Sequence, residues 1–437
     1  MSSKFNNIRK LYEKFVQFPF VCTDTRKILP NSLFFCLKGD NFDGNLFVNE
    51  ALEKGAQYVI TENKQLPKSD RIIVVDDVLK TLQQLANFHR KQLEIPIIGI
   101  TGTNGKTTTK ELIAAVLSKK YKTACTQGNL NNHIGVPLTL LSIKKDDEIA
   151  VIEMGANHPG EIAELCLIAQ PEYGLITNIG KAHLEGFGTI ENIIETKTAL
   201  YRVAQVLFVN KEDEVLMRCA VSGERCEVNG LPVSKIYYGK NTDITASILE
   251  MNPCLVIDMF GQRTQTQLTG NYNLPNILGA AAIGRFFNVS ENDICDAIAE
   301  YQPRNNRSQI IKSKTNTIIA DYYNANPTSM KAALDNFLQI DAPHKSAILG
   351  DMLELGENSL HEHQIIIDFC QTQHLETIFV GTNFFALKND RSQFFLNVHS
   401  CNEYLKEHQF DNRFILIKGS RGVHLEEMLT ITSIYHR

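Results

Sequence analysis

Residues 97–113 constrain the fold of this chain more than any other stretch. An apolar run leads into the turn Thr101-Gly-Thr-Asn-Gly-Lys-Thr-Thr-Thr109, and apolar residues at helical spacing follow. Glycines allow the backbone N–H groups of such a turn to face an anion, and the helix adds the partial positive charge of its N-terminus. The lysine reaches the β- and γ-phosphates, and the hydroxyl next to it ligates magnesium. The order of strand, loop and helix therefore predicts an α/β domain that binds a nucleoside triphosphate.

The spacing of this loop differs from that of the usual P-loop. A glycine normally stands six residues before the lysine, but Ile100 holds that position here and Gly102 takes its place. A glycine-rich turn that binds nothing is the alternative, and the combination of strand, Gly-Lys-Thr and helix argues against it. The residues predicted to hold the triphosphate are Gly102, Thr103, Asn104, Gly105, Lys106, Thr107 and Thr108.

Composition narrows the class of protein. A length of 437 residues corresponds to about three domains, and 43% hydrophobic residues provide material for their cores. The net charge of −5 argues against a nucleic-acid or membrane-surface protein, and we find neither a signal peptide nor an apolar run long enough to span a bilayer. The ten cysteines are dispersed, without a Cys-x-x-Cys pair, which is typical of reduced thiols. We therefore expect a cytoplasmic protein. We also expect a monomer, although no feature of the sequence reports the oligomeric state.

The first segment of the chain predicts a small α/β unit. Apolar runs at 32–37, 58–60 and 71–75 indicate buried strands. Two polar clusters, 23–26 and 38–45, lie among these strands. Because aspartate, threonine and glycine form turns, composition alone favours two ordinary surface turns at these positions.

Strands and helices alternate between about residues 95 and 303, which predicts a largely parallel sheet covered on both faces. Ligands of such sheets bind beyond the carboxyl ends of the strands. Glu153 stands near the end of an apolar strand, where a carboxylate is costly unless it is paired or bound to a cation. Magnesium held by Glu153 and Thr107 would satisfy it. His183 follows another strand, but magnesium seldom selects imidazole, and a histidine that caps a turn is an equal alternative.

Three further features of this region have two interpretations each. The loop 127–137 carries four amide side chains within six residues, which indicates either recognition of a polar ligand or a loop capped by its own side chains. Asn273 and Asn276 stand at a helix start, where they could bind a base edge or cap the helix; capping is favoured for one of them. Without further information, Lys197 on the helix predicted at 190–204 is an ordinary helix lysine.

The last segment, from about residue 304, predicts a second alternating α/β unit. Its strands, each followed by a polar loop and a helix, are expected at 317–320, 346–349, 377–380 and 414–417. Ser359 and Glu362 have the spacing of a capping box, so His361 and His363 are expected to be exposed on the first turns of a helix.

Six motifs, taken together, indicate a single protein family. They are the loop 101–109, Gly128-Asn-Leu-Asn-Asn-His-Ile-Gly135, Glu153-Met-Gly-Ala-Asn-His-Pro-Gly-Glu161, Ala182-His-Leu-Glu-Gly-Phe-Gly188, Tyr323-Asn-Ala-Asn-Pro327 and Leu349-Gly-Asp-Met352. This set resembles the Mur ligases, ATP-dependent amide ligases of peptidoglycan synthesis, and the short phosphate-loop spacing is that of the family. The resemblance implies a UDP-sugar-binding domain at 1–94, a central ATP-binding domain at 95–303 and a Rossmann-like domain at 304–437.

The resemblance also implies roles for single residues. The uridine nucleotide is expected at Thr23, Asp24, Thr25, Arg26, Phe42, Asp43 and Gly44. The muramoyl-peptide is expected at Asn131 and Asn132, and the adenine of ATP at Asn273 and Asn276. The phosphates and the ribose of ATP are expected at Arg307 and Asp321. Two magnesium ions are expected at Thr107, Glu153, His183 and a carbamylated Lys197. Carbamylation adds carbon dioxide to a neutral amine and requires a depressed lysine pKa.

One departure from the family concerns the arginine. Residues 303–307 read Pro-Arg-Asn-Asn-Arg where many relatives have Gly-Arg. Arg304 and Arg307 are therefore both candidates, and we favour Arg307. The resemblance extends to a loop that contains Lys418, Ser420 and Arg421, without assigning a role to any of them.

Within the family, the motifs resemble the branch that joins D-alanyl-D-alanine to UDP-N-acetylmuramoyl-tripeptide. The peptide carboxylate would form an acyl phosphate with ATP, and the dipeptide amine would attack it. The expected catalytic residues are Lys106, Lys197, His183 and Arg307. A sibling that adds the third amino acid typically carries Asp-Asn-Pro-Arg, which is absent here. Folylpolyglutamate synthetase lacks this first domain, and a non-catalytic nucleotide-binding regulator should have lost some of Lys106, Glu153, His183 and Lys197.

Overall fold

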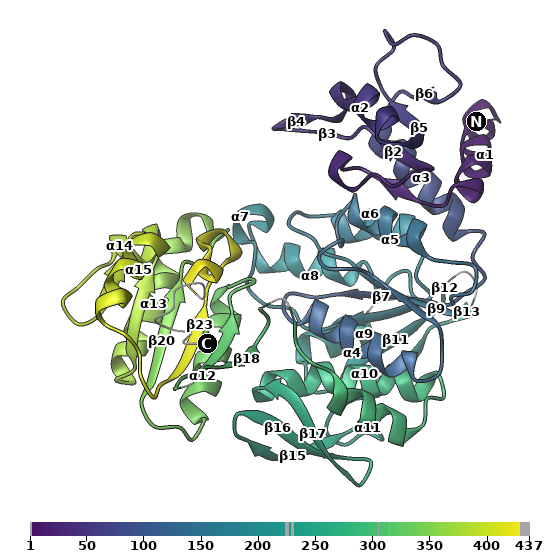
Figure 1. Ribbon diagram of the computed structural model, residues 1–437. Coiled ribbons are helices and arrows are strands. Elements are labelled where there is room, and N and C mark those ends of the chain that lie inside the picture. Colours follow the sequence, from purple (N-terminus) through teal and green to yellow (C-terminus); the bar gives the residue numbers. More distant parts are fainter. Residues whose placement is uncertain (1, 223–226, 229–230, 305, 314, 429–437) are drawn as a thin grey trace.

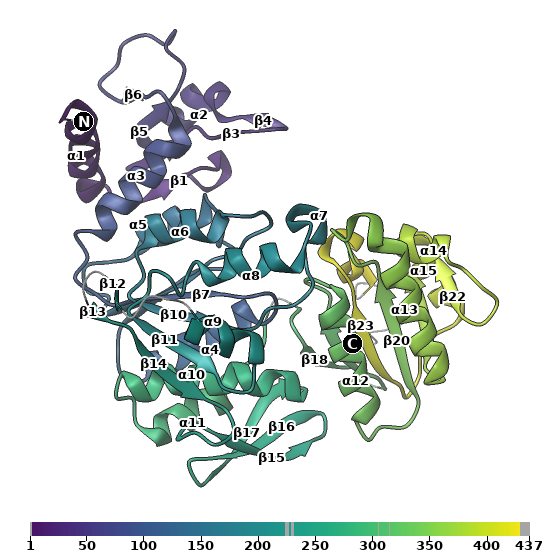
Figure 2. The same ribbon diagram turned by 180° about the vertical axis from the view of Figure 1, so that it is seen from behind.

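The computed structural model describes residues 2–428 apart from 223–226, 229–230, 305 and 314. Three α/β units follow one another along the chain, as the sequence predicts (Figure 1). The first unit sits on the second, and the third stands beside the second, next to α7 (Leu184–Phe187), which Figure 2 shows from behind. Among the helices described, none has both the length and the apolarity needed to cross a membrane.

The N-terminal unit is built on a parallel sheet in the order β1-β2-β5-β6. Strand β2 is buried along its whole length, as its apolar sequence predicts. The strands are β1 (Val21–Cys22), β2 (Ser32–Phe35), β5 (Ala56–Thr61) and β6 (Ile72–Val74), with a hairpin of β3 (Lys38–Gly39) and β4 (Phe42–Asp43). The helices are α1 (Ser2–Gln17), α2 (Val48–Glu53) and α3 (Val78–Arg90).

The central unit has a six-stranded parallel sheet in the order β14-β11-β10-β7-β9-β8. Its strands are β7 (Ile97–Thr101), β8 (Thr123–Cys125), β9 (Ile149–Glu153), β10 (Tyr173–Ile176), β11 (Val206–Asn210) and β14 (Ser234–Tyr238). The helices besides α7 are α4 (Lys106–Ser118), α5 (Gly135–Ser142), α6 (Glu161–Ala169), α8 (Ile190–Thr198), α9 (Glu214–Ser222), α10 (Leu274–Phe286) and α11 (Glu291–Glu300). An antiparallel sheet comprises β15 (Ala246–Met251), β16 (Cys254–Met259) and β17 (Gln262–Thr269), and a small hairpin β12 (Glu227–Val228) and β13 (Leu231–Pro232).

The C-terminal unit has a six-stranded sheet in the order β18-β19-β23-β20-β21-β22, in which only β18 runs antiparallel. The four expected strands are β19 (Thr317–Asp321), β20 (Lys345–Gly350), β21 (Glu376–Val380) and β23 (Phe414–Lys418). Two short edge strands were not predicted, β18 (Gln309–Lys312) and β22 (Gln393–Phe395). The helices are α12 (Pro327–Gln339), α13 (Ser359–Thr372), α14 (Thr382–Ala386) and α15 (Val398–Glu407).

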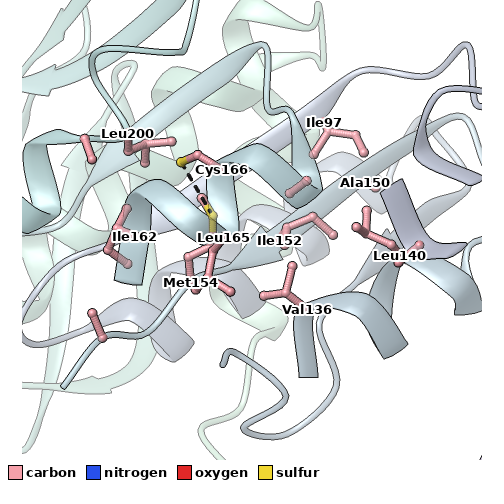
Figure 3. Packing of buried hydrophobic residues seen from close by; sticks show 14 of the residues in the cluster. Ile97, Val136, Leu140, Ala150, Ile152, Met154, Ile162, Leu165, Cys166 and Leu200 are labelled. Carbon is pink, nitrogen blue, oxygen red and sulfur yellow. Dashed lines mark hydrogen bonds between the residues drawn. The ribbon is translucent and has the colours of Figure 1, made fainter. Parts of the chain in front are cut away.

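The first two units share one hydrophobic core. Helix α3 of the N-terminal unit packs on α5 and α6 of the central unit. Below these helices, Ile152 of β9 and the following Met154 lie among side chains of α5 and α6, such as Val136 and Leu165 (Figure 3). The same cluster of buried residues continues into the N-terminal unit, where it includes Leu33. The two units are therefore expected to move as one body.

The expected capping box of α13 is wrong. Its N-cap residue is Asn358, which makes no side-chain capping bond. His361 is exposed as expected, but His363 is fully buried, because it belongs to the helix face that packs on the sheet. The Nε2 atom of His363 accepts a hydrogen bond from Met352 N at 3.0 Å, and its Nδ1 lies 2.6 Å from the carbonyl of Ser359. This histidine therefore fixes the loop that follows β20.

Arg90 joins the first two units at the end of α3. Its buried guanidinium donates to the carbonyls of Ala169 (2.9 Å) and Gln170 (3.1 Å) and contacts the Glu172 carboxylate. Glu172 in turn accepts from Ile97 N at 2.9 Å.

We expect Arg90→Met to lower the free energy of unfolding by about 2–3 kcal/mol, since buried acceptors lose a charged donor. Urea denaturation measures this change. The control Arg9→Met removes an exposed ion pair with Glu13 and should leave stability nearly unchanged. Equal losses in the two variants would contradict the role of Arg90.

Candidate active site

The phosphate loop connects β7 to α4 in the way that the sequence predicts, and its two glycines are required by its geometry. Gly102 has φ 145°, and a Cβ atom there would lie 1.9 Å from Thr177 Oγ1. Gly105 has φ 77° at the start of α4, and a Cβ atom there would lie 2.7 Å from Asn276 Oδ1. Both values of φ lie in the region that favours glycine. A side chain at either position would displace its neighbours.

Two lysine side chains meet at the Gly102 carbonyl. Lys106 Nζ donates to Gly102 O at 2.8 Å and to Thr103 O at 2.9 Å, and Lys197 Nζ on α8 donates to Gly102 O at 3.0 Å. Desolvation lowers the pKa of Lys106 to about 8, with a smaller opposing effect of Glu153. Burial, and then the charge of Lys106, lowers the pKa of Lys197 well below its ordinary value. Lys197 is therefore not an ordinary exposed lysine.

Glu153 ends β9 and is 1% exposed. Its Oε1 atom accepts hydrogen bonds from Thr107 Oγ1 at 3.1 Å and from Asn131 Nδ2 at 2.8 Å. Its Oε2 atom is buried without a hydrogen-bond partner in the described part of the chain. A hydroxyl beside a carboxylate with a free oxygen suits magnesium, which prefers oxygen ligands. Among the described residues, no group of three or more His, Cys, Asp or Glu side chains could hold a metal. A metal beside Glu153 therefore needs other ligands as well, such as the Thr107 hydroxyl.

His183 faces the C-terminal unit. It has φ 50° at the start of α7, and its side chain makes no capping hydrogen bond, so the expected turn-capping alternative is wrong. Its Nδ1 atom contacts the carboxylate of Glu354, in the loop after β20. That contact lowers the pKa of Glu354. The sequence offered no signal for this partner, because the contact depends on how two domains pack.

Asn273 and Asn276 lie against the phosphate loop. Asn273 is the N-cap residue of α10, but it has φ −87° and ψ −14°, not the extended conformation that a capping side chain needs, so the favoured capping interpretation is wrong. Its Nδ2 atom donates to Thr269 O at 2.8 Å, and Asn276 Nδ2 donates to Asn273 Oδ1 at 2.9 Å. Asn276 Oδ1 accepts from Thr109 Oγ1 at 3.0 Å. The pair is thus fixed behind the first turn of α4.

A cleft of about 280 Å³ separates the phosphate loop from the C-terminal unit. Thr107 and Asn129 line it on one side, and Arg307, Tyr323 and Arg421 on the other. The guanidinium groups of Arg307 and Arg421 lie 3.7 Å and 5.7 Å from the centre of the Tyr323 ring. Arg307 Nε is buried and has no hydrogen-bond partner among the described residues. Two cations therefore border a cleft that begins at the phosphate loop.

Lys418 and Ser420, to which the sequence assigned no role, make polar contacts at the end of β23 and in the loop after it. Lys418 is buried, and its Nζ atom lies 2.6 Å from Asp321 Oδ2. Asp321 Oδ1 also accepts from Ser308 N at 3.2 Å. Ser420 Oγ accepts from Leu353 N at 3.0 Å, which ties the loop after β23 to the loop after β20.

The predicted nucleotide residues of the N-terminal unit form capped turns. Asp24 accepts from Arg26 N at 3.0 Å and pairs with its guanidinium at 2.8 Å, which lowers the pKa of Asp24 to about 2. Asp43 caps the turn after β4 by accepting from Asn45 N at 2.9 Å. The neighbouring Phe42 is 55% exposed. These turns match the interpretation from composition, and binding of a nucleotide at Thr23, Asp24, Thr25, Arg26, Phe42, Asp43 and Gly44 stays a prediction.

The two asparagines expected at the muramoyl-peptide differ from each other. Asn132 Oδ1 accepts from Ile134 N (3.1 Å) and Gly135 N (2.9 Å), so it caps the start of α5. Asn131 instead donates to the Glu153 carboxylate. One residue of the loop thus stabilises the loop itself, and the other reaches the candidate metal ligand.

Comparisons with known proteins identify the family. Successive parts of the chain match the models for the Mur ligase family, catalytic domain (17–90), the Mur ligase middle domain (100–284) and the Mur ligase, glutamate ligase domain (306–421). The UDP-N-acetylmuramoyl-tripeptide--D-alanyl-D-alanine ligase of Bacillus subtilis (strain 168) is 34% identical, over 94% of this chain and 92% of its own. The chain belongs to the Mur ligase family. The enzyme of the same name from Haemophilus influenzae is 32% identical to this Mur ligase, over 95% and 93% of the two chains.

Solved structures of the family resemble this Mur ligase along its length. MurF from Acinetobacter baumannii matches with a TM-score of 0.83 and 31% identity, and covers 94% of this chain and 92% of its own. MurF ligase from Thermotoga maritima in complex with ADP matches with a TM-score of 0.81 and 27% identity, over 95% and 97%. The fold expected for this Mur ligase is confirmed in all three domains.

Asn326 connects the C-terminal domain to the phosphate loop. Its Nδ2 atom donates to Asn104 Oδ1 at 2.8 Å, while its Oδ1 atom caps α12 by accepting from Ser329 N at 2.9 Å. In Asn326→Ser, the serine side chain can still cap α12, but it is too short to reach Asn104.

We expect Asn326→Ser to weaken docking of the C-terminal domain by about 1 kcal/mol, since one neutral hydrogen bond is lost. Small-angle X-ray scattering should show a larger radius of gyration. Asn397→Ser is the matched control, because Asn397 caps α15 in the same way. Among the described residues, its side chain makes no hydrogen bond to another domain. An unchanged radius in Asn326→Ser would argue against the contact.

Proposed function

We propose that this Mur ligase joins D-alanyl-D-alanine to UDP-N-acetylmuramoyl-tripeptide and converts ATP to ADP and phosphate. The observation that carries the proposal is the meeting of Lys106, Lys197 and Glu153 at the phosphate loop. Arg307 borders the same cleft from the C-terminal domain. The Bacillus subtilis relative, which aligns with 94% of the chain, is named for this reaction. The product is the UDP-linked pentapeptide precursor of peptidoglycan.

In the first step, a carboxylate oxygen of the tripeptide attacks the γ-phosphorus of ATP, the bond to the β-phosphate oxygen breaks, and ADP leaves. Negative charge on the transferred phosphoryl group needs cations that are already in place. Lys106 would exchange its two carbonyl partners for phosphate oxygens. Arg307 Nε, which is buried without a hydrogen-bond partner in the described structure, would donate from the opposite side of the cleft.

In the second step, the amine of D-alanyl-D-alanine attacks the acyl phosphate. The tetrahedral intermediate collapses to the amide and phosphate, and the proton lost by the amine passes to the leaving phosphate or to water. This sequence of steps requires no nucleophilic serine or cysteine. It does require that water stays away from the acyl phosphate, and closure of the C-terminal domain over the cleft would exclude it.

Thr107 and Glu153 would hold a magnesium ion. When bound, magnesium offsets charge on the phosphates and on the acyl phosphate. His183 would join them through its Nε2 atom, while Nδ1 keeps its contact with Glu354. Such a carboxylate contact is common behind metal-bound histidines.

We further propose that Lys197 is carbamylated. A lowered pKa increases the fraction of neutral amine, which is the form that adds carbon dioxide. The carbamate would replace the repulsion between Lys197 and Lys106 by attraction and would provide oxygen ligands for a second magnesium ion. The buried position of Lys197 on α8 would protect the carbamate from water.

The remaining parts of the substrates would be held by residues of all three domains. We propose domains at 1–94, 95–303 and 304–437, with the UDP group at the turns that Asp24 and Asp43 cap. Asn273 and Asn276 would contact adenine, and Asp321 the ribose. The Asp321 carboxylate would keep its contact with Lys418 in that role.

The direct test is a phosphate-release assay with ATP, magnesium and UDP-N-acetylmuramoyl-tripeptide. We expect continuous phosphate release only when D-alanyl-D-alanine is added, because the acyl phosphate needs the amine. Release that is independent of the dipeptide would count against the assignment. Release with a single amino acid on the UDP-dipeptide would identify the sibling ligase instead.

A second test concerns the carbamate. Lys197→Ala should lower kcat by at least about 100-fold, because the loss of one preorganised charge at a phosphoryl-transfer site is costly. Formate or acetate should restore part of the rate, since a short carboxylate can occupy the space of the carbamate. Lys106→Ala is the control, and no carboxylate should rescue it, because its missing group is a cation. Full activity of Lys197→Ala would exclude the carbamate.

A further inference from the structure

Lys110 lies beside the proposed metal site and has no part in the mechanism above. It stands one helical turn after Lys106 on α4, and its side chain is 2% exposed. Its Nζ atom lies 3.9 Å from Glu153 Oε2 and 3.9 Å from Glu111 Oε1. A buried ammonium group is strongly unfavourable without a counter-charge. One or both of these carboxylates must therefore balance the charge of Lys110.

The two oxygens of Glu153 face different groups. Oε1 accepts from Thr107 and Asn131, so it is turned to the phosphate loop. Oε2 has no hydrogen-bond partner in the described structure and lies on the side of Lys110. Lys110 is the only basic group within 4.0 Å of the Glu153 carboxylate among the residues described. Lys110 thus faces the carboxylate oxygen that Thr107 and Asn131 leave free.

Glu111 depends less on Lys110. Its side chain is 24% exposed, so that water stabilises its charge, and its Oε2 atom accepts from Tyr301 Oη at 2.7 Å. Glu153 is 1% exposed and has no such access to water. Of the two carboxylates, Glu153 therefore gains more from the nearby ammonium group.

We propose that Lys110 is a positioning residue whose ammonium group balances the Glu153 carboxylate while the metal is absent. It keeps this ligand in place, with Oε1 beside Thr107, until magnesium arrives with the nucleotide. The inference rests on the proposed role of Glu153 as a metal ligand. Lys110 and the metal are then alternative counter-charges for one buried carboxylate.

Lys110→Met removes the charge and keeps most of the side-chain length. We expect a clearly lower melting temperature of the full-length protein without ligands, and a smaller difference from the wild type with magnesium and a non-hydrolysable ATP analogue. Calorimetry with the analogue present should show several-fold tighter magnesium binding, because the metal now supplies the missing charge. Lys119→Met is the control, since Lys119 is the C-cap residue of the same helix but pairs with Glu300 at the surface (2.8 Å).

Two double variants identify the partner. The effect of Lys110→Met on the ligand-free melting temperature should largely vanish in a Glu153→Gln background and persist in a Glu111→Gln background. An equal loss in all backgrounds, or an equal loss with and without magnesium and the analogue, would overturn the inference. If Lys110→Met does not fold, recovery by Glu153→Gln but not by Glu111→Gln supports the pair, and failure to recover overturns it.

These experiments distinguish a failure of the Lys110 inference from a failure of the proposed function. If magnesium and the analogue do not bind the wild type, the proposed function fails. The ligand-free comparison of the double variants then still decides whether Lys110 and Glu153 act as a pair.

Discussion

Two ammonium groups share a single backbone oxygen at the centre of this molecule. Lys106 and Lys197 both donate to the Gly102 carbonyl, although like charges at this distance repel each other. Burial is the main cause of the lowered pKa of each lysine, and for Lys197 the charge of Lys106 adds to this cost. A polyanion relieves it, and so does conversion of one lysine to a carbamate. Both of these anionic groups, the triphosphate and the carbamate, belong to the proposed reaction.

The domains place these charges in different ways. The N-terminal and central domains share a hydrophobic core and the buried Arg90, so the phosphate loop and the proposed UDP site keep a fixed relation. The C-terminal domain meets the central domain through polar contacts such as Asn326 with Asn104 and His183 with Glu354. Polar contacts of this kind can break and form again, as domain motion in a ligase requires. Arg307 would approach and leave the phosphates with that domain.

Local patterns in the sequence predicted the features that depend on neighbouring residues. The apolar run, glycines and helix of the phosphate loop are of this kind, as is the buried carboxylate at the end of β9. Features that depend on packing were either not predicted or predicted wrongly. His363 is buried because its helix face meets the sheet, and the backbone conformation of Asn273 excludes capping. The His183 partner belongs to another domain, and the edge strands β18 and β22 each carry only two adjacent apolar residues.

A crystal structure with a non-hydrolysable ATP analogue and magnesium tests the central claim most directly. We expect phosphate oxygens at the N–H groups of residues 102–107, Lys106 turned from the Gly102 carbonyl to the phosphates, and a metal ion between Thr107 and Glu153. Extra density on Lys197 Nζ would show the carbamate. An analogue bound elsewhere, with Lys106 and Lys197 still sharing the Gly102 carbonyl, would contradict the account.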